Sequence, residues 1–353
     1  MKAATDLIDL DAALAALTPC APRVEAEIVR LPLAAPFRIS DRVFEDVPVV
    51  IVRLEADGHI GTGEAAGVFY LGDEPEGMLR QILAVRRVIG EGVDHAGLVT
   101  LLPAGGARNA LDCALWDLQA RRAGQAVWQL LGMSQPRPLL TTFTLGNGTP
   151  ADMAEAAIGY AQARAPKLKL NGDPADADRV RAVRAARPDA WLGVDANRSL
   201  TPATLAQLAP AMIAADVQLV EQPFRVGEDR RLAAIDLPIP FAADESVQTK
   251  ADVDRLAALY QVINIKLDKC GGLTEGLRMA ARARALGLGV MVGNMLGTSR
   301  AMAPGWLLGQ QCDVVDLDGP LFLVGDVAPA ATYRDGLIDF DAGVWAVNQR
   351  SER

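Results

Sequence analysis

The chain has 353 residues, of which 50% are hydrophobic and 22% are charged, a balance typical of a globular protein and not of a disordered one. This length exceeds what one hydrophobic core usually supports, so two domains are expected. A net charge of -9 and a pI near 4.9 argue against nucleic acid or an anionic membrane as the main partner, and no apolar run approaches the roughly 20 residues that span a bilayer.

Residues 1–22 are expected to form an N-terminal extension. Met1–Cys20 contains aspartates and a single lysine, the reverse of the basic start of a signal peptide. Four cysteines lie in apolar stretches without CxxC spacing: Cys20, Cys113, Cys270 and Cys312. This usage predicts reduced, buried thiols and a cytoplasmic location.

Residues 23–135 show strand patterns first and helical patterns afterwards, which is typical of an α+β domain. The strand patterns alternate between apolar and polar side chains, and a turn signal, Asp57-Gly58, separates the second from the third. The expected strands are 24–31, 47–55 and 59–64, and the expected helices are 74–89 and 106–131. The two histidines, His59 and His95, lie in this part of the chain and are expected at the surface.

Residues 136–320 alternate between short apolar strands and helical segments, which indicates a parallel α/β barrel. The polar residues that end its central strands are 22 to 26 residues apart, about one strand, one helix and two loops. Because the carboxyl ends of all barrel strands face one mouth, these side chains should converge there. Residues 321–353 have room for one or two strands that return to the first domain. The strand candidates are 141–145, 167–169, 194–195, 220–221, 243–244, 265–266, 292–294 and 315–318.

Three carboxylates, Asp195, Glu221 and Asp244, follow apolar residues at the ends of three successive strands. A single acid in such a place is usually a loop or helix-cap residue, but three grouped acids would repel one another in a partly dry mouth. A hard cation bound through oxygen removes this repulsion, and Mg²⁺ suits a set of ligands without histidine. The sequence therefore predicts one Mg²⁺ per subunit.

Lysines lie on both sides of these acids. Lys167 and Lys169 point to the same face of one strand, because side chains alternate with period two, and Lys266 ends a strand across the mouth. Like charges side by side lower the pKa of a lysine toward the range where it acts as a base. Two bases on opposite sides of one carbon can exchange a proton between its faces, as racemisation or epimerisation requires. The alternative is that these lysines are solvated strand ends.

The chain resembles the enolase superfamily, in its muconate-lactonizing-enzyme subgroup. Five motifs carry the resemblance in order: Lys167-Leu168-Lys169, Val194-Asp195-Ala196-Asn197, Glu221-Gln222-Pro223, Ala243-Asp244-Glu245-Ser246, and the segment from Ile265 to Gly272. The resemblance implies an α/β fold with a modified TIM (β/α)7β-type barrel and an α+β capping domain that closes over the substrate. It also implies that the three acids bind Mg²⁺, that Lys169 and Lys266 are the acid/base pair, and that Lys167 tunes Lys169.

A further motif, Asp316-Leu317-Asp318, ends the eighth strand candidate. Dipeptide epimerases carry such a motif, which is expected to hold the free ammonium group of the substrate; a plain strand end before a Gly-Pro turn is the alternative. The resemblance then implies a dipeptide of the L-Ala-L-Xaa type, inverted at the Cα of its C-terminal residue through an enediolate. It also implies that Thr298 and Ser299 lie near the substrate.

The loop over residues 36–44 is expected to set specificity. Family members that act on L-Ala-L-Glu place an arginine there, and Arg42 could serve, but alignment from the following strand without gaps brings Phe44 to one such position. The opposite wall, residues 68–71, is apolar. The C-terminal residue of the substrate could therefore be either a glutamate or an apolar residue. The sequence also leaves open whether the chain forms a homo-oligomer.

Other functions compete with dipeptide epimerisation. N-succinylamino acid racemase, o-succinylbenzoate synthase and muconate cycloisomerase are chemistries of the same subgroup, but their substrates leave Asp316 and Asp318 unexplained. Sugar-acid dehydration of the mandelate-racemase type commonly needs a histidine from the seventh strand, and both histidines here precede the barrel. A non-catalytic binding barrel is disfavoured because all five catalytic and metal positions are filled.

Overall fold

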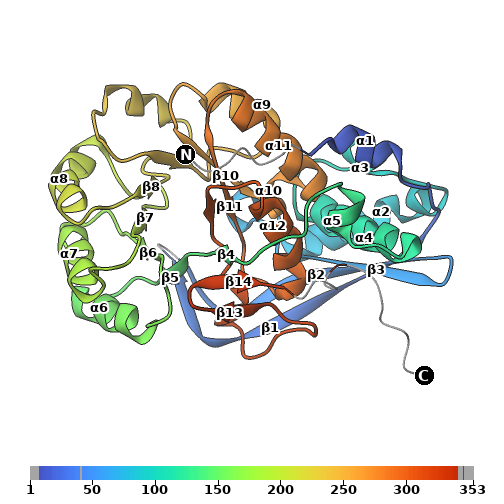
Figure 1. Cartoon of the computed structure of the whole chain (residues 1–353), viewed down its shortest axis with the longest axis horizontal. Helices are drawn as coiled ribbons and strands as arrows, with labels where there is room; N and C mark the ends of the chain where they lie inside the picture. The colour runs from blue at the N-terminus through green and yellow to red at the C-terminus, as the bar shows by residue number, and fades with distance from the viewer. Residues whose placement is uncertain (1–7, 40–41, 341–344, 346–353) are drawn as a thin grey trace.

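The computed structural model describes residues 8–39, 42–340 and 345; side chains at 37–39, 42 and 43 lie outside the description. The chain forms an eight-stranded parallel sheet and two three-stranded antiparallel sheets. The parallel sheet runs in chain order from β5 to β12, and Thr142 N donates to Val315 O at 2.8 Å, which links its two edge strands. The sheet therefore curls into the expected barrel (Figure 1). Its strands are β5 (Phe143–Leu145), β6 (Pro166–Lys169), β7 (Gly193–Asp195), β8 (Leu219–Glu221), β9 (Phe241–Ala243), β10 (Val262–Lys266), β11 (Gly289–Gly293) and β12 (Val314–Val315).

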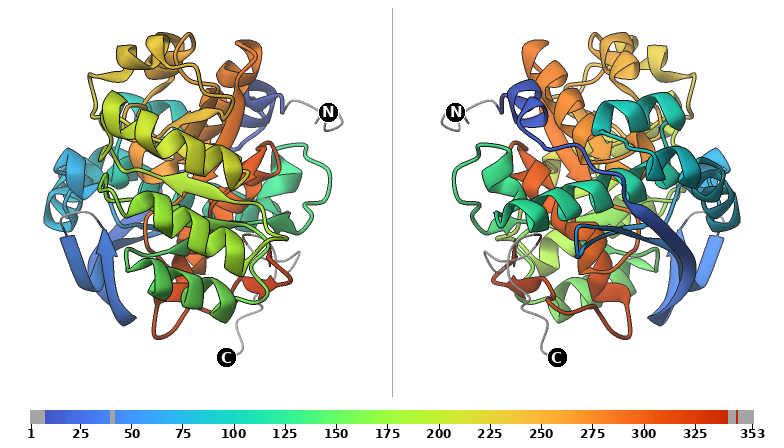
Figure 2. Two further views of the ribbon diagram at one scale, coloured as in Figure 1. Left: turned by 90° about the vertical axis from the view of Figure 1, so that its left-hand side faces the viewer. Right: turned by 90° about the vertical axis from the view of Figure 1, so that its right-hand side faces the viewer.

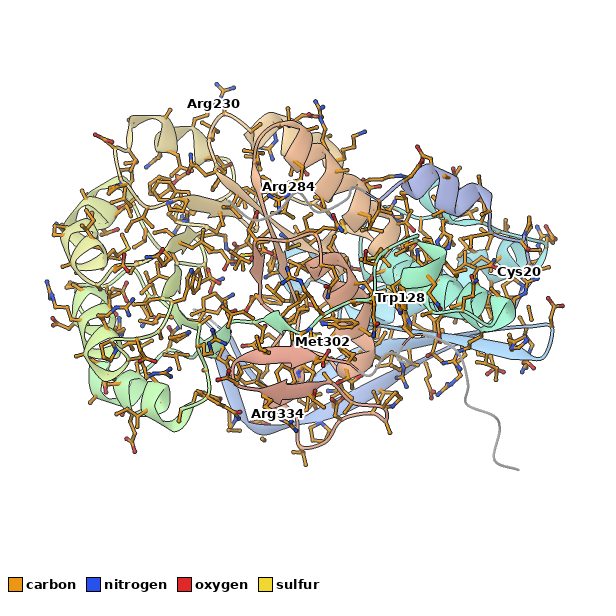
Figure 3. The ribbon with its side chains drawn as sticks, in the orientation of Figure 1. Cys20, Trp128, Arg230, Arg284, Met302 and Arg334 are labelled. Carbon is orange, nitrogen blue, oxygen red and sulfur yellow. The ribbon has the colours of Figure 1, made fainter. Side chains whose placement is uncertain are left out.

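Helices α6 to α8, α9, α11 and α12 lie outside the barrel strands (Figures 1 and 2). Two of them begin at Thr-Pro pairs: Thr149 and Thr201 cap α6 and α8 through their hydroxyls, and the proline that follows occupies the first turn. In Figure 3, Met302 of α12 lies among core side chains, whereas Arg230 points away from the molecule. The barrel helices are α6 (Pro150–Gly159), α7 (Asp176–Ala186), α8 (Pro202–Ala214), α9 (Lys250–Leu256), α10 (Leu267–Cys270), α11 (Leu273–Ala285) and α12 (Ser299–Gly309).

The capping domain is built on the antiparallel sheet β1 (Arg23–Ile39), β2 (Arg42–Ala56) and β3 (His59–Ala65). Helix α4 (Gly106–Ala123) packs on β3 so closely that a Cβ at Gly61 or Gly63 would meet helix backbone oxygens at 2.2 and 2.0 Å. The expected single helix over 106–131 is wrong, because Gly124 ends α4 at a φ of 65°. The other helices of this region are α1 (Leu10–Ala15), α2 (Pro75–Gly90), α3 (His95–Leu101) and α5 (Val127–Leu130).

Buried polar contacts fasten α3 and α4 to the barrel. His95 Nδ1 lies 2.7 Å from Asp112 Oδ1, and Thr274 of α11 donates to the same oxygen at 2.6 Å. Trp116 donates to the Thr274 hydroxyl at 2.9 Å. His95 is only 2% exposed, because α3 places its ring against Trp116, so the expected surface position is wrong. His59 is exposed as expected.

The C-terminal segment contacts both parts of the molecule. Strand β14 (Leu337–Asp339) pairs with β13 (Thr332–Arg334) on one side and with β4 (Leu139–Leu140), which precedes the barrel strands, on the other. Leu323 forms a bridge to Leu33 of β1, so the segment also reaches the capping sheet. All four cysteines are buried and free. Among the described helices, none combines the length and apolar character that crossing a bilayer requires.

Candidate active site

Polar residues at or directly after the strand ends line one cavity between the barrel mouth and the capping domain: Lys167, Lys169, Asp244 and Lys266. Asp195 and Glu221 are not among its lining residues. Parallel pairing places Lys169 beside Asp195 and Asp195 beside Glu221, and Asp244 directly follows β9. Asp195 and Glu221 are 0% exposed and Asp244 is 1% exposed. The sheet register thus brings the three predicted acids together, with Lys169 on one side and Lys266 of β10 on the other.

Each of these carboxylates is held by a lysine. Lys169 Nζ donates to Asp195 Oδ2 at 2.6 Å, and Lys266 Nζ donates to Asp244 Oδ2 at 2.8 Å. Lys167 Nζ lies 3.2 Å from Glu221 Oε2. Within the described ranges, no group of three or more His, Cys, Asp or Glu side chains is already arranged around a common metal position.

The chemistry of the three acids fits a hard divalent cation. Burial, together with the charge of Asp195, raises the pKa of Glu221 to about 7. Burial also raises the pKa of Asp244, but the ammonium groups of Lys266 and Lys269 lower it more, and it stays well below its usual range. Buried carboxylates that oppose one another's ionisation are the donors that Mg²⁺ stabilises.

Lys167 is held by buried carboxylates. Burial lowers its pKa, but the charges of Asp316, Glu221 and Asp195 raise it by more, so its pKa lies well above the ordinary value. Its ammonium group bridges Glu221 and Asp316. The buried carboxylates therefore keep Lys167 charged, and its tuning of Lys169 stays a prediction.

Asp316 and Asp318 lie in the loop that follows β12, and both line the cavity. Asp316 binds Lys167 and the Thr142 hydroxyl, so both of its oxygens have protein partners. Asp318 Oδ2 accepts from Thr144 N at 2.7 Å. Burial and the charge of Asp316 raise the pKa of Asp318 by more than the charge of Lys167 lowers it.

The other predicted substrate contacts divide into two groups. Phe44 lines the cavity and packs edge-to-face on Phe69, with ring centroids 5.6 Å apart; Arg42 belongs to β2, but its side chain lies outside the described residues. Thr298 donates to Glu64 of β3, and Ser299 donates to Asp326. Neither hydroxyl lines the cavity, because each donates a hydrogen bond to a carboxylate, that of Thr298 to Glu64 and that of Ser299 to Asp326.

Three polar residues around the site were not assigned from the sequence. Lys269 is 1% exposed and donates to Asp244 Oδ1 at 2.6 Å. Arg198 and Glu245 line the cavity and form an ion pair at 3.0 Å. Lys269 and Glu245 stand inside two of the recognised motifs, and a charged residue in an apolar stretch is the only signal that could have singled them out.

Two family descriptions match this chain. Residues 23–132 match "Mandelate racemase / muconate lactonizing enzyme, N-terminal domain", and residues 151–312 match "Enolase C-terminal domain-like". L-Ala-D/L-Glu epimerase of Escherichia coli K12 is 41% identical over 306 residues, covering 86% of this chain and 95% of that protein. N-acetyl-D-glutamate racemase of a Pseudoalteromonas species is 41% identical, covering 72% of this chain and 81% of that protein.

Two solved structures share the whole fold. An enolase family member from Agrobacterium tumefaciens, with homology to dipeptide epimerases and with bound sodium and L-Ala-L-Glu, has a TM-score of 0.88 and 37% identity, covering 92% of this chain and 100% of that one. A dipeptide epimerase from Enterococcus faecalis, in complex with Mg and L-Leu-L-Tyr, has a TM-score of 0.82 and 28% identity, covering 90% and 96%.

Proposed function

The chain belongs to the mandelate racemase/muconate lactonizing enzyme group of the enolase superfamily, and from this premise we propose that it is a Mg²⁺-dependent dipeptide epimerase. It is an isomerase that acts on amino acid derivatives, as its relatives are. The substrate is a dipeptide with a free amino group, and the reaction inverts the Cα of the C-terminal residue. The proposal rests most on one observation: two buried lysines, Lys169 and Lys266, flank the three carboxylates from opposite sides.

The two lysines act as the acid/base pair. One Nζ, as a neutral amine, removes the proton from Cα and becomes an ammonium, and the opposite Nζ, as an ammonium, delivers its proton to the other face, which inverts the configuration. Both Nζ atoms lie against carboxylates, Lys169 against Asp195 and Lys266 against Asp244. Held in this way, the two nitrogens would lie on opposite sides of the reacting carbon, as orientation of a proton transfer requires.

Asp195, Glu221 and Asp244 would hold the Mg²⁺ ion. When bound, the ion supplies positive charge that stabilises the negative charge developing on the substrate carboxylate. Asn264 donates to Glu221 Oε1 at 2.6 Å, and Lys269 donates to Asp244 Oδ1, so each of these two carboxylates is oriented by a buried partner.

The free ammonium group of the substrate is held at the far end of the cavity, chiefly by Asp318. Asp316 already binds Lys167 and Thr142, whereas Asp318 has one backbone donor and an environment that raises its pKa. The ammonium group of the substrate would form an ion pair with the buried carboxylate of Asp318. Asp316 instead orients Lys167 and adds negative charge beside the ammonium position.

Replacing Asp318 with Asn should lower kcat/KM for L-Ala-L-Xaa by about 10- to 150-fold, because a hydrogen bond to a charged group typically contributes about 1.5–3 kcal/mol. The same variant should discriminate less between L-Ala-L-Xaa and N-acetyl-L-Ala-L-Xaa. Asp316→Asn should affect both substrates, because it releases Lys167. Steady-state kinetics with each substrate pair measures this, and an unchanged preference for the free amine in Asp318→Asn contradicts the assignment.

Racemisation of an N-acylated amino acid is the second candidate, favoured by the similarity to N-acetyl-D-glutamate racemase. Such a substrate carries no ammonium group, and the buried Asp316 and Asp318 would remain without a substrate cation. The two functions predict opposite orders of kcat/KM for L-Ala-L-Glu and N-acetyl-L-Glu. Faster turnover of the acylated amino acid would overturn the dipeptide proposal and leave the lysine pair and the metal set in place.

A further inference from the structure

Four cations line the cavity among the described residues: Lys167, Lys169, Arg198 and Lys266. The three lysines lie at the barrel strands and are bound to the carboxylates of the site. Arg198 differs, because it follows the end of β7 and its side chain is 32% exposed toward the cavity. It is therefore the cation in this set that has no part in the proton transfer or in holding the acids.

The guanidinium of Arg198 has an acidic and an aromatic neighbour. Its Nε lies 3.0 Å from Glu245 Oε1, and its central carbon lies 5.3 Å from the centre of the Tyr70 ring, in a cation–π contact. Glu245 is 6% exposed, and its other carboxylate oxygen has no hydrogen-bond partner among the described residues. Likewise, the two terminal amino groups of the Arg198 guanidinium donate to no described protein atom, so this end of the group is available to a ligand.

The backbone that carries Arg198 is held in an unusual conformation. Asn197 and Arg198 have φ values of 40° and 70°, a left-handed region that residues other than glycine seldom occupy. Asn197 N donates to Asp195 Oδ1 at 2.9 Å, and Arg198 N donates to Gln222 O at 2.8 Å. Strained backbone that is maintained by its surroundings clusters at ligand sites, and here it directs one arginine into the cavity.

We propose that Arg198 is the specificity-determining residue for the inverted amino acid and that it selects an acidic, glutamate-type side chain by pairing with the side-chain carboxylate. Glu245 occupies the Nε edge, which leaves the two terminal amino groups for a bidentate contact with a carboxylate. The Tyr70 hydroxyl, buried without a partner among the described residues, supplies a further donor. The methylene groups of the substrate side chain then lie along the aromatic wall of Phe44 and Phe69.

This inference rests on the proposed function, and one experiment separates the two. We would measure kcat/KM for L-Ala-L-Glu and for its neutral isostere L-Ala-L-Gln with the Mg²⁺-loaded wild type and with Arg198→Gln, Arg198→Lys and Arg42→Gln. Arg231→Gln is the matched control, because Arg231 lies in the turn Asp229–Ala234 with its side chain 51% exposed. The unfolding temperature and the Mg²⁺ affinity of each variant show whether the substitution has disturbed the fold or the metal site.

The wild type should prefer L-Ala-L-Glu, and Arg198→Gln should lower kcat/KM for it by about 10- to 150-fold, the range for a charge-assisted hydrogen bond. The loss of kcat/KM with L-Ala-L-Gln should be at least about ten times smaller. Arg198→Lys keeps the positive charge but not the planar guanidinium, so it should retain part of the preference for L-Ala-L-Glu. Equal losses with both dipeptides, a loss of preference in Arg42→Gln instead, or a wild type that prefers neutral dipeptides would each overturn the inference. A wild type that turns over neither of these dipeptides but turns over an apolar L-Ala-L-Xaa dipeptide would overturn the inference alone, and one that turns over no L-Ala-L-Xaa dipeptide would overturn the proposed function as well.

Discussion

Alanine in place of Lys169 or Lys266 should abolish epimerisation, because inversion needs one base on each face of Cα. Loss of a general base typically costs about 10²–10⁴-fold in rate, and here it removes one of the two proton transfers altogether. Both side chains are buried at the barrel mouth, Lys169 on β6 and Lys266 on β10. Chiral chromatography of the product dipeptide measures the loss. Lys250→Ala, a lysine at the exposed start of α9, is the control.

The two alanine variants should also differ from each other. A variant with one remaining lysine can still remove and return the Cα proton on the face that this lysine approaches. In D₂O, one variant should therefore exchange the Cα proton of the L,L-dipeptide and the other that of the L,D-dipeptide. Epimerisation at a near wild-type rate in either variant, or loss of the same half-reaction in both, would be inconsistent with the two-base mechanism.

Neutral isosteres at the three acids should weaken Mg²⁺ binding. We expect Asp195→Asn, Glu221→Gln and Asp244→Asn to lose at least about 10-fold in affinity, since even the loss of a residue that only orients a metal ligand typically costs 10–100-fold. Isothermal titration with Mg²⁺ measures this directly. Binding to the native state raises the unfolding temperature, so the stabilisation by Mg²⁺ should shrink in parallel.

Asp254→Asn serves as the control for these variants, because its carboxylate lies at the protein surface and pairs with Arg282. Its Mg²⁺ affinity should equal that of the wild type. Unchanged affinity in all three site variants would place the metal elsewhere. Each isostere keeps the size and shape of the acid that it replaces, so the fold should tolerate the change.

The barrel and the strand-end residues could be predicted from the sequence, because both follow from local rules. Side chains alternate along a strand, parallel strands end at one mouth, and each strand-helix unit has a nearly constant length. These rules bring Lys169, Asp195, Glu221 and Asp244 together without knowledge of any contact distant in sequence. The buried cysteines follow as directly from their apolar neighbours.

The remaining features depend on contacts that no local pattern encodes. The Thr298 hydroxyl meets Glu64, which lies 234 residues away, and this contact removes Thr298 from the cavity. His95 is buried because Asp112 and Thr274 meet it from two helices. The Arg198 side chain is oriented by its left-handed backbone conformation and by contact with Tyr70, a residue of the other domain. Packing between the domains therefore decides which polar residues face the substrate.

The central claim is that this chain inverts the C-terminal Cα of a free dipeptide. The most direct measurement incubates the protein with Mg²⁺ and L-Ala-L-Glu in D₂O and follows both residues by proton NMR. The account predicts loss of the glutamate Cα proton signal, growth of the signals of the L,D-epimer, and an unchanged alanine Cα proton. Retention of the glutamate Cα proton with no epimer formed, or exchange at the alanine instead, would contradict it.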